Sequence, residues 1–455
     1  MMTITRTPGE IKALPSNPVR DYLRHPALYR TDRVGLFQEV FRTCGDLGTF
    51  RVGRRTYYLA SSVELAHQLL VKNGAMLDKP RRFQVAMGPL LGDGLLAASN
   101  EVHAVQRKLI QPKFRKKTLL STSAEVAATY SREAADRWAD GEVIDVYAQM
   151  MRLVMLIVAK DVFGRSVHED ASDFGTALNE AIAEFNTGVS ALAQFTAMLP
   201  SRSRRRYLRA IAAMNRTFYR MLEEHRTDPD PPDDWLTALL ECRYDDGSPM
   251  SDVQIRDEAI NLLMAGNETT GAGLTWTCHL LSRHPAVYDR LLDEVRDVLA
   301  GRTVTVDDLP KLPYTLQVFK ESMRLYPPVY MFSRQPAQDV TACGHTIPAG
   351  AAILFSPYVL HHRADYFPDP ERFDPDRFSP ERERDIPTHA YMPFASGHRI
   401  CIGNNHALLN GQIALATLSQ RVRFSAIPGQ EVALEPKLTL RPRGGLKLKV
   451  QRLPE

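Results

Sequence analysis

The chain has 455 residues, of which 44% are hydrophobic and 24% charged, a composition that excludes disordered, collagen-like and mucin-like proteins. The 57 Lys and Arg barely outnumber the 53 Asp and Glu, so the net charge of +4 argues against nucleic-acid binding. The first residues lack the apolar stretch of a secretion signal, and the longest apolar segment, 150–159, falls short of the roughly 20 residues that a spanning helix needs. We therefore expect a cytoplasmic protein without a membrane anchor.

The first predicted elements are strands. Residues 48–60 contain two β-rich runs separated by Gly53, which predicts a hairpin, and residues 65–73 predict a helix that ends at Gly74. Between residues 79 and 100 the apolar residues lose their period while several glycines and a proline appear. This pattern predicts a long loop of the kind that often carries function.

A helical middle follows, and strands return near the end of the chain. Helical patterns dominate residues 102–300, apart from surface loops predicted at 200–206 and 227–234. Beyond Pro327, prolines crowd together and short β-rich runs replace the helices, for example at 352–356 and 438–450. If the early hairpin pairs with these late strands, both ends of the chain belong to one unit. We therefore expect a single mainly helical α+β domain over residues 1–455, with a β-rich part near 45–75, 327–390 and 430–452 and a helical part near 76–326 and 391–429.

The five cysteines form no disulfide or zinc pattern, because they are scattered, odd in number and lack C-x-x-C spacing. One of them, Cys401, lies in residues 393–403, PFASGHRICIG, which fit the pattern F-x-x-G-x-R-x-C-x-G. This segment resembles the haem-binding loop of the cytochrome P-450 superfamily. The other four cysteines are expected to be ordinary packing residues.

The resemblance implies that Cys401 binds haem iron as a thiolate, with a backbone that approaches the cofactor closely. Gly397 can adopt a positive φ before the sulfur, and Gly403 lets the next helix begin without a Cβ clash. Phe394 would shield the sulfur, and Arg399 would pair with a haem propionate.

A second signature, AGNETT at residues 265–270, lies inside a helical pattern over 257–284. A glycine and two threonines are unfavourable in a helix interior, and such exceptions are typical of functional sites. The segment matches the family pattern A-G-x-E-T, which implies that Ala265 lies over the haem and that Thr269 opens the helix. Glu268 and Thr269 would then relay protons from solvent toward dioxygen. For an isolated segment, a threonine bonded to its own helix is the alternative.

A third pattern predicts scaffold. Glu321 and Arg324 are three residues apart on one helix face, and a P-x-R-F segment at 375–378 supplies Arg377. In the family such residues form a buried network, so we assign these three to structure and not to chemistry.

Further haem contacts are predicted by position. His103 and Arg107 are four apart on one predicted helix face and resemble the family's propionate partners, as does Arg334. Solvated surface cations are the alternative. By the same positional analogy, substrate contacts are expected from Phe83, Met87, Leu95, Phe185 with the segment around it to residue 199, Asn261, Met264, Val329 and Phe332.

The resemblance implies a cytochrome P-450 fold with haem b buried between two long helices. Its activity would be that of a monooxygenase, inserting one oxygen atom of O2 into a hydrophobic small molecule of terpenoid, polyketide or fatty-acyl type, in secondary metabolism. Two electrons would come from NAD(P)H through a ferredoxin or flavodoxin and its reductase. The enzyme is expected to be a monomer. The electron-transfer partner would dock on a basic run that comprises Lys108, Lys113, Arg115, Lys116 and Lys117.

Two alternatives have other chemistry. A peroxide-driven haem-thiolate enzyme would usually lack the acid–alcohol pair, and a non-catalytic haem sensor would not need it. The presence of Glu268 and Thr269 argues against both.

Overall fold

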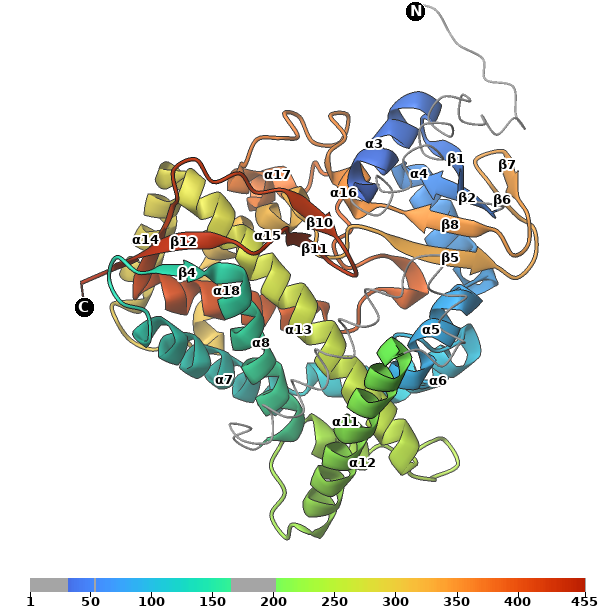
Figure 1. The fold of residues 1–455 in the computed structure, drawn as a ribbon, viewed down its shortest axis with the longest axis horizontal. Helices are drawn as coiled ribbons and strands as arrows, with labels where there is room; N and C mark the ends of the chain where they lie inside the picture. The colour runs from blue at the N-terminus through green and yellow to red at the C-terminus, as the bar shows by residue number, and fades with distance from the viewer. Residues whose placement is uncertain (1–31, 53–54, 165–201, 455) are drawn as a thin grey trace, which may run out of the picture.

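The computed structural model describes residues 32–52, 55–164 and 202–454. One long helix, α13 (Asp252–Arg283), crosses the centre of the molecule, with other helices packed around it and a sheet to one side (Figure 1). In these described ranges no helix is both long and apolar enough to cross a membrane. The many helices around α13 and the smaller sheets confirm the predicted mainly helical α+β class.

The largest sheet has five strands in the order β1-β2-β8-β5-β3. β1 (Leu47–Val52) and β2 (Arg55–Ala60) form the predicted antiparallel hairpin, and β2 pairs in parallel with β8 (Ala352–Phe355). β5 (Phe332–Pro336) lies between β8 and the short β3 (Leu77–Asp78) and pairs with both in antiparallel fashion. Early and late segments of the chain thus share one sheet, and α3 (Arg33–Cys44) packs against its hairpin.

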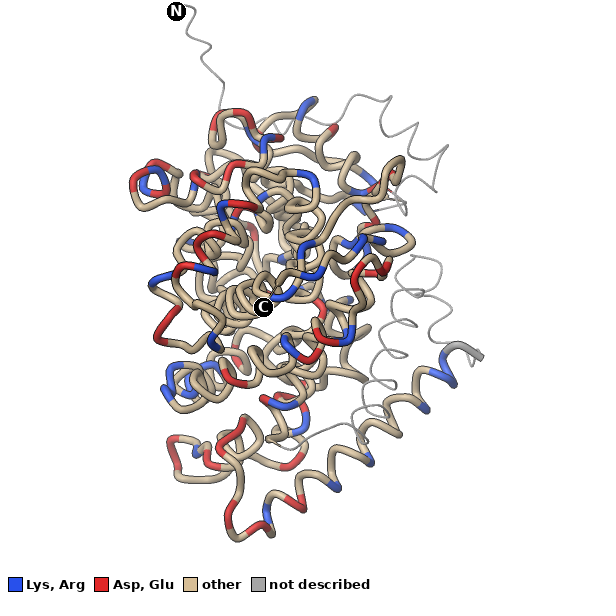
Figure 2. Tube along the Cα trace, turned by 90° about the vertical axis from the view of Figure 1, so that its left-hand side faces the viewer, with Lys and Arg blue, Asp and Glu red and all other residues tan. Residues whose placement is uncertain are grey.

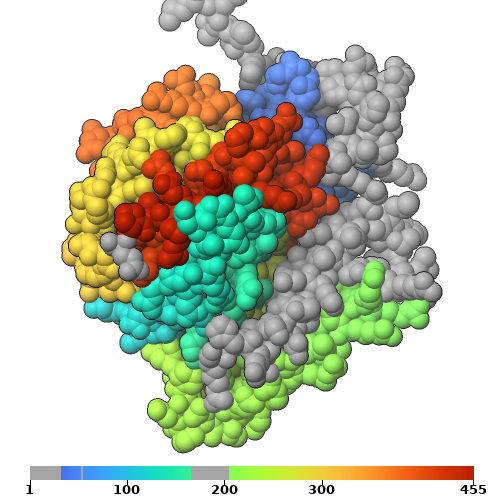
Figure 3. All heavy atoms as spheres, turned by 60° about the vertical axis from the view of Figure 1, so that its left-hand side comes forward, coloured from blue at the N-terminus to red at the C-terminus, as the bar shows by residue number. Residues whose placement is uncertain are grey.

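Three smaller sheets complete the β structure of the described residues. Their strands are β4 (Val143–Asp145), β12 (Lys447–Arg452) and β9 (Val422–Ala426) in one sheet, β10 (Leu434–Pro436) with β11 (Leu440–Pro442), and β6 (Val340–Ala342) with β7 (His345–Ile347). In Figure 3 the C-terminal segment lies on the surface beside the segment that holds β4.

β4 and β9 lie in segments that were predicted to be helical, and this prediction was wrong. Both strands are short, with three and five residues, and both take their ladder bonds from β12. A run this short carries too little periodicity to reveal a strand when the partner is distant in sequence.

The main helices pack around α13 in a single large hydrophobic cluster. α13 begins where the Ser251 side chain accepts a hydrogen bond from the Gln254 N–H, and Pro285 opens the next helix. Besides α13, the main helices are α6 (Asn100–Ile110), α7 (Lys117–Asp136), α8 (Val146–Phe163), α11 (Arg202–Thr227), α12 (Trp235–Leu240), α14 (Pro285–Leu299), α15 (Pro313–Leu325) and α18 (Asn404–Ser419). Short helical turns comprise α4 (Val63–Ala66), η1 (His67–Lys72), η2 (Gly74–Met76), η3 (Lys113–Arg115), η4 (Val306–Lys311), α16 (Pro357–His361), η5 (Pro375–Phe378), α17 (Pro380–Glu383) and η6 (Gly397–Arg399).

The predicted loop over residues 79–100 is half helix, because α5 (Arg81–Leu91) occupies its first part. Pro89 lies only two residues from the end of α5, so the lost N–H affects one turn, and Leu90 and Leu91 are fully buried. Gly92, with φ +55°, then ends the helix. The burial of this face outweighs the glycine and proline signals that predicted a loop.

The basic run at 200–206 was predicted to be a loop, but α11 begins at Arg202. Arginine is a good helix former, so a basic run does not by itself break a helix. Figure 2 shows α11 with basic residues at its start and acidic ones toward its end, while the rest of that view mixes both signs.

Candidate active site

The loop before α18 holds Cys401 in a fixed turn. The Cys401 N–H donates to the Phe394 carbonyl at 2.9 Å, and Gly403 caps α18 two residues later. Gly397 has φ +75°, and a Cβ at this position would overlap the carbonyl oxygen of Leu70. Both the conformation and the close approach of the backbone therefore require glycine.

Cys401 is an exposed residue, although the surrounding protein removes part of the solvation of its thiol. Burial raises the pKa of this thiol, whereas the Gly403 N–H and the Arg107 guanidinium lower it. Arg107 is itself held by a 2.6 Å bond to the Ile400 carbonyl, next to the cysteine. Donors aimed at a sulfur favour its thiolate form, which is the form that binds metals.

We predict that Gly397→Ala prevents this loop from forming, so that the purified protein lacks haem. Gly429→Ala is the matched control, since Gly429 also has φ +75° but nothing lies within 4 Å of its missing Cβ. Both variants suffer left-handed strain of about 1–2 kcal/mol, whereas only the first also displaces Leu70. Haem content per chain measures the difference, and equal haem contents in the two variants would contradict the prediction.

The AGNETT segment lies in the middle of α13. Ala265 is exposed whereas Met264 and Glu268 are buried, and the Thr269 hydroxyl donates to the Ala265 carbonyl at 2.7 Å. α13 runs without interruption through this segment, so the opening expected at Thr269 is limited to that single bond. A threonine that takes a carbonyl four residues back weakens the helix locally without breaking it.

Glu268 is bonded to Thr439, in the turn between β10 and β11, and not to Thr269. Its Oε1 accepts from the Thr439 hydroxyl at 2.9 Å, while Oε2 is buried and has no hydrogen-bond partner in the part of the chain that the structure describes. Burial raises the pKa of Glu268, and Thr439 and Arg441 lower it. The acid can therefore hold a proton at Oε2 at a higher pH than an exposed glutamate.

A cluster of basic side chains lies between the start of α6, β3, β5 and the cysteine loop. Arg399 donates from Nε to Asn100 at 2.8 Å and from Nη2 to Asp78 at 3.0 Å, but its buried Nη1 has no partner among the described residues. His103 is buried nearby, and burial together with Arg399 lowers its pKa to about 3. His103 therefore offers an N–H at this place and not a charge.

Two more cations of this cluster, the buried Arg334 and the half-buried Lys79, form no ion pair with the described residues. Arg334 is 3% exposed and donates to the Ser333 carbonyl at 2.9 Å; burial and then Arg399 lower its pKa to about 9. Burial also lowers the pKa of Lys79, and repulsion from Arg334 and Arg399 lowers it further. Such an accumulation of buried positive charge requires an anionic partner.

The three residues assigned to scaffold meet away from this cluster. Arg324 forms two bonds to Glu321, at 2.7 and 2.8 Å, and both side chains are completely buried. Arg377 lies on η5 with its Nε 3.4 Å from Glu321 Oε1, and the Asp374 N–H donates to the same oxygen at 3.0 Å.

A sequence model of the family described as "Cytochrome P450" matches residues 22–450 of the chain. The chain belongs to the cytochrome P450 family. Among similar curated proteins, cyclooctat-9-en-7-ol 5-monooxygenase of Streptomyces melanosporofaciens is 35% identical over 85% of this chain and 84% of that protein. Pentalenene oxygenase of Streptomyces avermitilis is 34% identical over 85% of this chain and 86% of that protein.

Solved structures agree with the fold of this P450. The heme domain of cytochrome P450DA superposes with a TM-score of 0.86 at 24% identity over 99% of both chains. The retinoic acid-bound cyanobacterial CYP120A1 gives a TM-score of 0.81 at 25% identity over 94% of this chain and 96% of that one. The family and the relatives named as oxygenases show that this P450 is a monooxygenase that uses haem iron and O2, as the sequence predicted.

The residues of this P450 fit a haem. The cysteine loop presents one exposed cysteine, and a porphyrin's two propionates would suit the basic cluster, where Nη1 of Arg399 has no partner among the described residues. Lys79 is a member of this cluster that sequence reasoning missed. It belongs to no motif and is brought there only by the pairing of β3 with β5.

The predicted substrate residues of this P450 are divided among several places. Phe83, Met87 and Met264 pack in the main hydrophobic cluster, whereas the Phe332 ring stacks on Phe355 of the five-stranded sheet, with centroids 5.2 Å apart. Leu95 and Val329 are half-buried and belong neither to the main hydrophobic cluster nor to the smaller one at the five-stranded sheet. Phe185 and the segment around it lie outside the described residues. Asn261 is buried with its amide bonded to the backbone between α5 and α6, which leaves it little capacity to bind substrate.

The predicted docking run is largely neutralised in this P450. Lys108, Lys113 and Lys116 form ion pairs with carboxylates of the α12 region, at 2.7, 2.8 and 2.5 Å; these are Asp245, Glu241 and Asp233 respectively. Arg115 and Lys117 form no ion pair with the described part of the chain. The surface is therefore less basic than the sequence suggested.

Proposed function

We propose that this P450 hydroxylates or epoxidises a hydrophobic terpenoid in secondary metabolism. Cys401 would hold haem b, and a ferredoxin or flavodoxin with its reductase would supply electrons from NAD(P)H. The observation that carries the proposal is the Cys401 loop, because its sulfur, glycine turn and neighbouring cations suit one cofactor. One catalytic domain, a monomeric state and a cytoplasmic location remain predictions.

The terpenoid class is supported by the relatives. Besides the two proteins named above, cyclooctatin synthase of Streptomyces melanosporofaciens is 34% identical over 87% of this chain. Apolar residues of α5 and α13, such as Met87 and Met264, would suit a hydrocarbon skeleton. A fatty-acyl substrate is the second candidate, because leukotriene-B4 omega-hydroxylase 3 of Mus musculus is 31% identical over 86% of this chain.

Each residue has a distinct task in this proposal. When bound, haem supplies the oxidising chemistry, and the protein supplies its binding and the surrounding polar groups. Arg399, Arg334 and Lys79 would hold the propionates with His103 as a further donor. Glu268 would keep a proton at Oε2, and the Thr269 hydroxyl, which donates to the Ala265 carbonyl, would offer its oxygen as an acceptor one residue further along α13.

A spectral titration tests the substrate class. We predict that pentalenene or cyclooctat-9-en-7-ol changes the haem absorption of the ferric protein at micromolar concentration and is oxygenated when NADPH, a ferredoxin and its reductase are added. Burial of apolar ligand surface supplies the affinity, at about 25 cal/mol per Å². Palmitic acid is the comparison. A response to palmitic acid alone would favour the fatty-acyl candidate, and turnover that needs peroxide instead of reductant would contradict the electron route.

A further inference from the structure

The loop between α5 and α6 is bonded to one stretch of α13. The N–H groups of Asp93, Leu95 and Leu96 donate to side chains of α13 at 3.0, 3.1 and 2.9 Å; the acceptors are Asp257 Oδ2, Glu258 Oε2 and Asn261 Oδ1. The Asn261 amide also donates to the Leu91 carbonyl at 2.9 Å. The three acceptor residues are all at most 5% exposed, so their partners cannot be replaced freely by water.

Two glycines allow the loop to lie this close to α13. A Cβ on Gly92 would overlap the Asp257 carboxylate, and a Cβ on Gly94 would overlap the Asn261 amide. Gly88, one turn earlier in α5, has nothing within 4 Å of its missing Cβ. Close approach is thus a property of the loop glycines and not of every glycine in this region.

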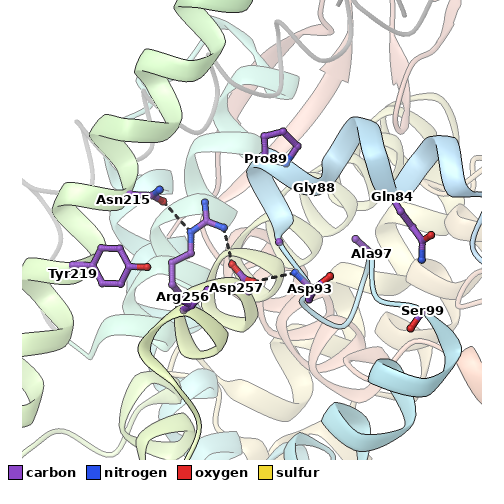
Figure 4. A pocket seen from close by; sticks show the side chains of 12 residues that line it. Gln84, Gly88, Pro89, Asp93, Ala97, Ser99, Asn215, Tyr219, Arg256 and Asp257 are labelled. Carbon is purple, nitrogen blue, oxygen red and sulfur yellow. Dashed lines mark hydrogen bonds and ion pairs between the residues drawn. The ribbon is translucent and has the colours of Figure 1, made fainter. Parts of the chain in front are cut away.

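The same stretch of α13 also reaches α11. Arg256 donates to Asn215 of α11 at 2.8 Å and to Asp257 at 2.8 Å, so Asp257 stands between two elements. Figure 4 shows the resulting row of contacts from Asn215 through Arg256 and Asp257 to Asp93. It borders a cavity of about 660 Å³ between α5, α11 and α13.

We propose that Asp257, Glu258 and Asn261 form a latch that fixes the loop at residues 92–96 to α13 before substrate binds. The loop is then a preformed wall of the substrate pocket and not a lid that closes on the substrate, and the latch sets how tightly distal ligands bind. The proposal rests on the proposed function for the position of the pocket. The latch residues are positioning residues, since their polar atoms are bonded to the loop backbone and not aimed at a reacting atom.

Opening of the loop would be costly. It would remove one backbone donor from each of two buried carboxylates and one buried amide, and it would leave the N–H groups of Asp93, Leu95 and Leu96 without these acceptors, which is disfavoured. A wall that is already ordered does not lose conformational freedom when a ligand arrives, which favours affinity. Weakening the latch should therefore weaken binding while the cysteine loop and the basic cluster, which contain none of the latch residues, remain intact.

Hydrogen exchange on the ligand-free holoenzyme tests the latch without any knowledge of the substrate. We expect the amides of Asp93, Leu95 and Leu96 to be protected in the wild type. In Asn261→Leu and Gly94→Ala, the Leu96 amide should exchange at least about ten-fold faster, because its acceptor is lost or displaced. Gly88→Ala is the matched control and should leave exchange unchanged. Unprotected wild-type amides that become protected only with ligand would identify the loop as a lid and overturn the proposal.

Ligand binding tests the consequence with a probe that does not depend on the substrate class. The probe is 4-phenylimidazole, a hydrophobic ligand of haem iron. Its Kd should rise about five-fold or more in Asn261→Leu and Gly94→Ala while haem content and the reduced carbon monoxide spectrum stay at the wild-type level. An unchanged Kd despite faster exchange would refute the role in binding. Failure of pentalenene to change the spectrum, with the exchange result as expected, would count against the proposed substrate and not against the latch.

Discussion

Replacement of Cys401 by serine is expected to abolish monooxygenase turnover and to remove the red-shifted, thiolate-type band of the reduced carbon monoxide complex. A serine hydroxyl ionises far less readily than a thiol, so the Gly403 N–H and Arg107, which lower the pKa of the Cys401 thiol, would have no anionic sulfur to stabilise. Thiolate ligation gives the iron the electron density that this class of oxidation needs. We expect turnover to fall at least a thousand-fold, a barrier increase of about 4 kcal/mol.

The loop itself should survive this substitution. Its turn is closed by the backbone bond from the Cys401 N–H to the Phe394 carbonyl, and Gly397 and Gly403 are unaltered. Cys343→Ser is the matched control, since Cys343 is the other exposed cysteine of the chain. The control should keep the spectrum and the activity. A red-shifted band in properly folded, reduced Cys401→Ser protein would refute the assignment of the iron ligand.

Features confined to one continuous segment could be predicted from the sequence. The cysteine loop, the α13 signature and the hairpin of β1 and β2 each lie within a few turns of chain, so residue order reveals them. α5 was missed because its glycine and proline signals are local, whereas the burial of Leu90 and Leu91 depends on distant elements. Local signals decide only where packing does not oppose them.

Features that depend on long-range pairing could not be predicted. Lys79 joins the basic cluster because β3 pairs with β5, and Glu268 meets Thr439 across 171 positions of sequence. Asn261 was assigned to substrate because it lies on the right helix, yet its amide bonds to the backbone of Leu96 in the loop after α5 and of Leu91 at the end of α5. In each case the side chain type was informative, but its partner was visible only in three dimensions.

The net charge of the predicted docking run also depends on long-range partners that the sequence does not reveal. Counting lysines along the chain predicted a basic surface, but three of them meet carboxylates that follow more than 100 positions later. Exposed ion pairs of this kind contribute little stability, yet they cancel the field that would attract an acidic partner. The choice between a ferredoxin and a flavodoxin therefore gains no support from the sum of charges.

The second large effect is expected for Glu321→Ala, which should yield protein that folds poorly and retains little haem. Arg324 is 0% exposed, and the substitution removes the carboxylate that accepts from its Nε and Nη2 together with the ion-pair partner of Arg377. An uncompensated buried charge costs about 3–5 kcal/mol. The bonds from Arg324 to the carbonyls of His361 and Arg372 connect this site to the segment that leads to the cysteine loop. Haem content per chain and urea denaturation of the holoenzyme measure the effect.

Glu39→Ala provides a control with the same local geometry in a different environment. Glu39 and Arg42 are also three residues apart and joined by two bonds, at 2.9 and 2.6 Å, but their side chains are 40% and 74% exposed. Water can solvate both charges after the exposed pair is lost, so neither haem content nor the free energy of unfolding should change measurably. The contrast isolates burial as the cause, because spacing and bond geometry are matched. A Glu321→Ala protein with full haem content would show that the network is dispensable for the haem site and would contradict its assignment as scaffold.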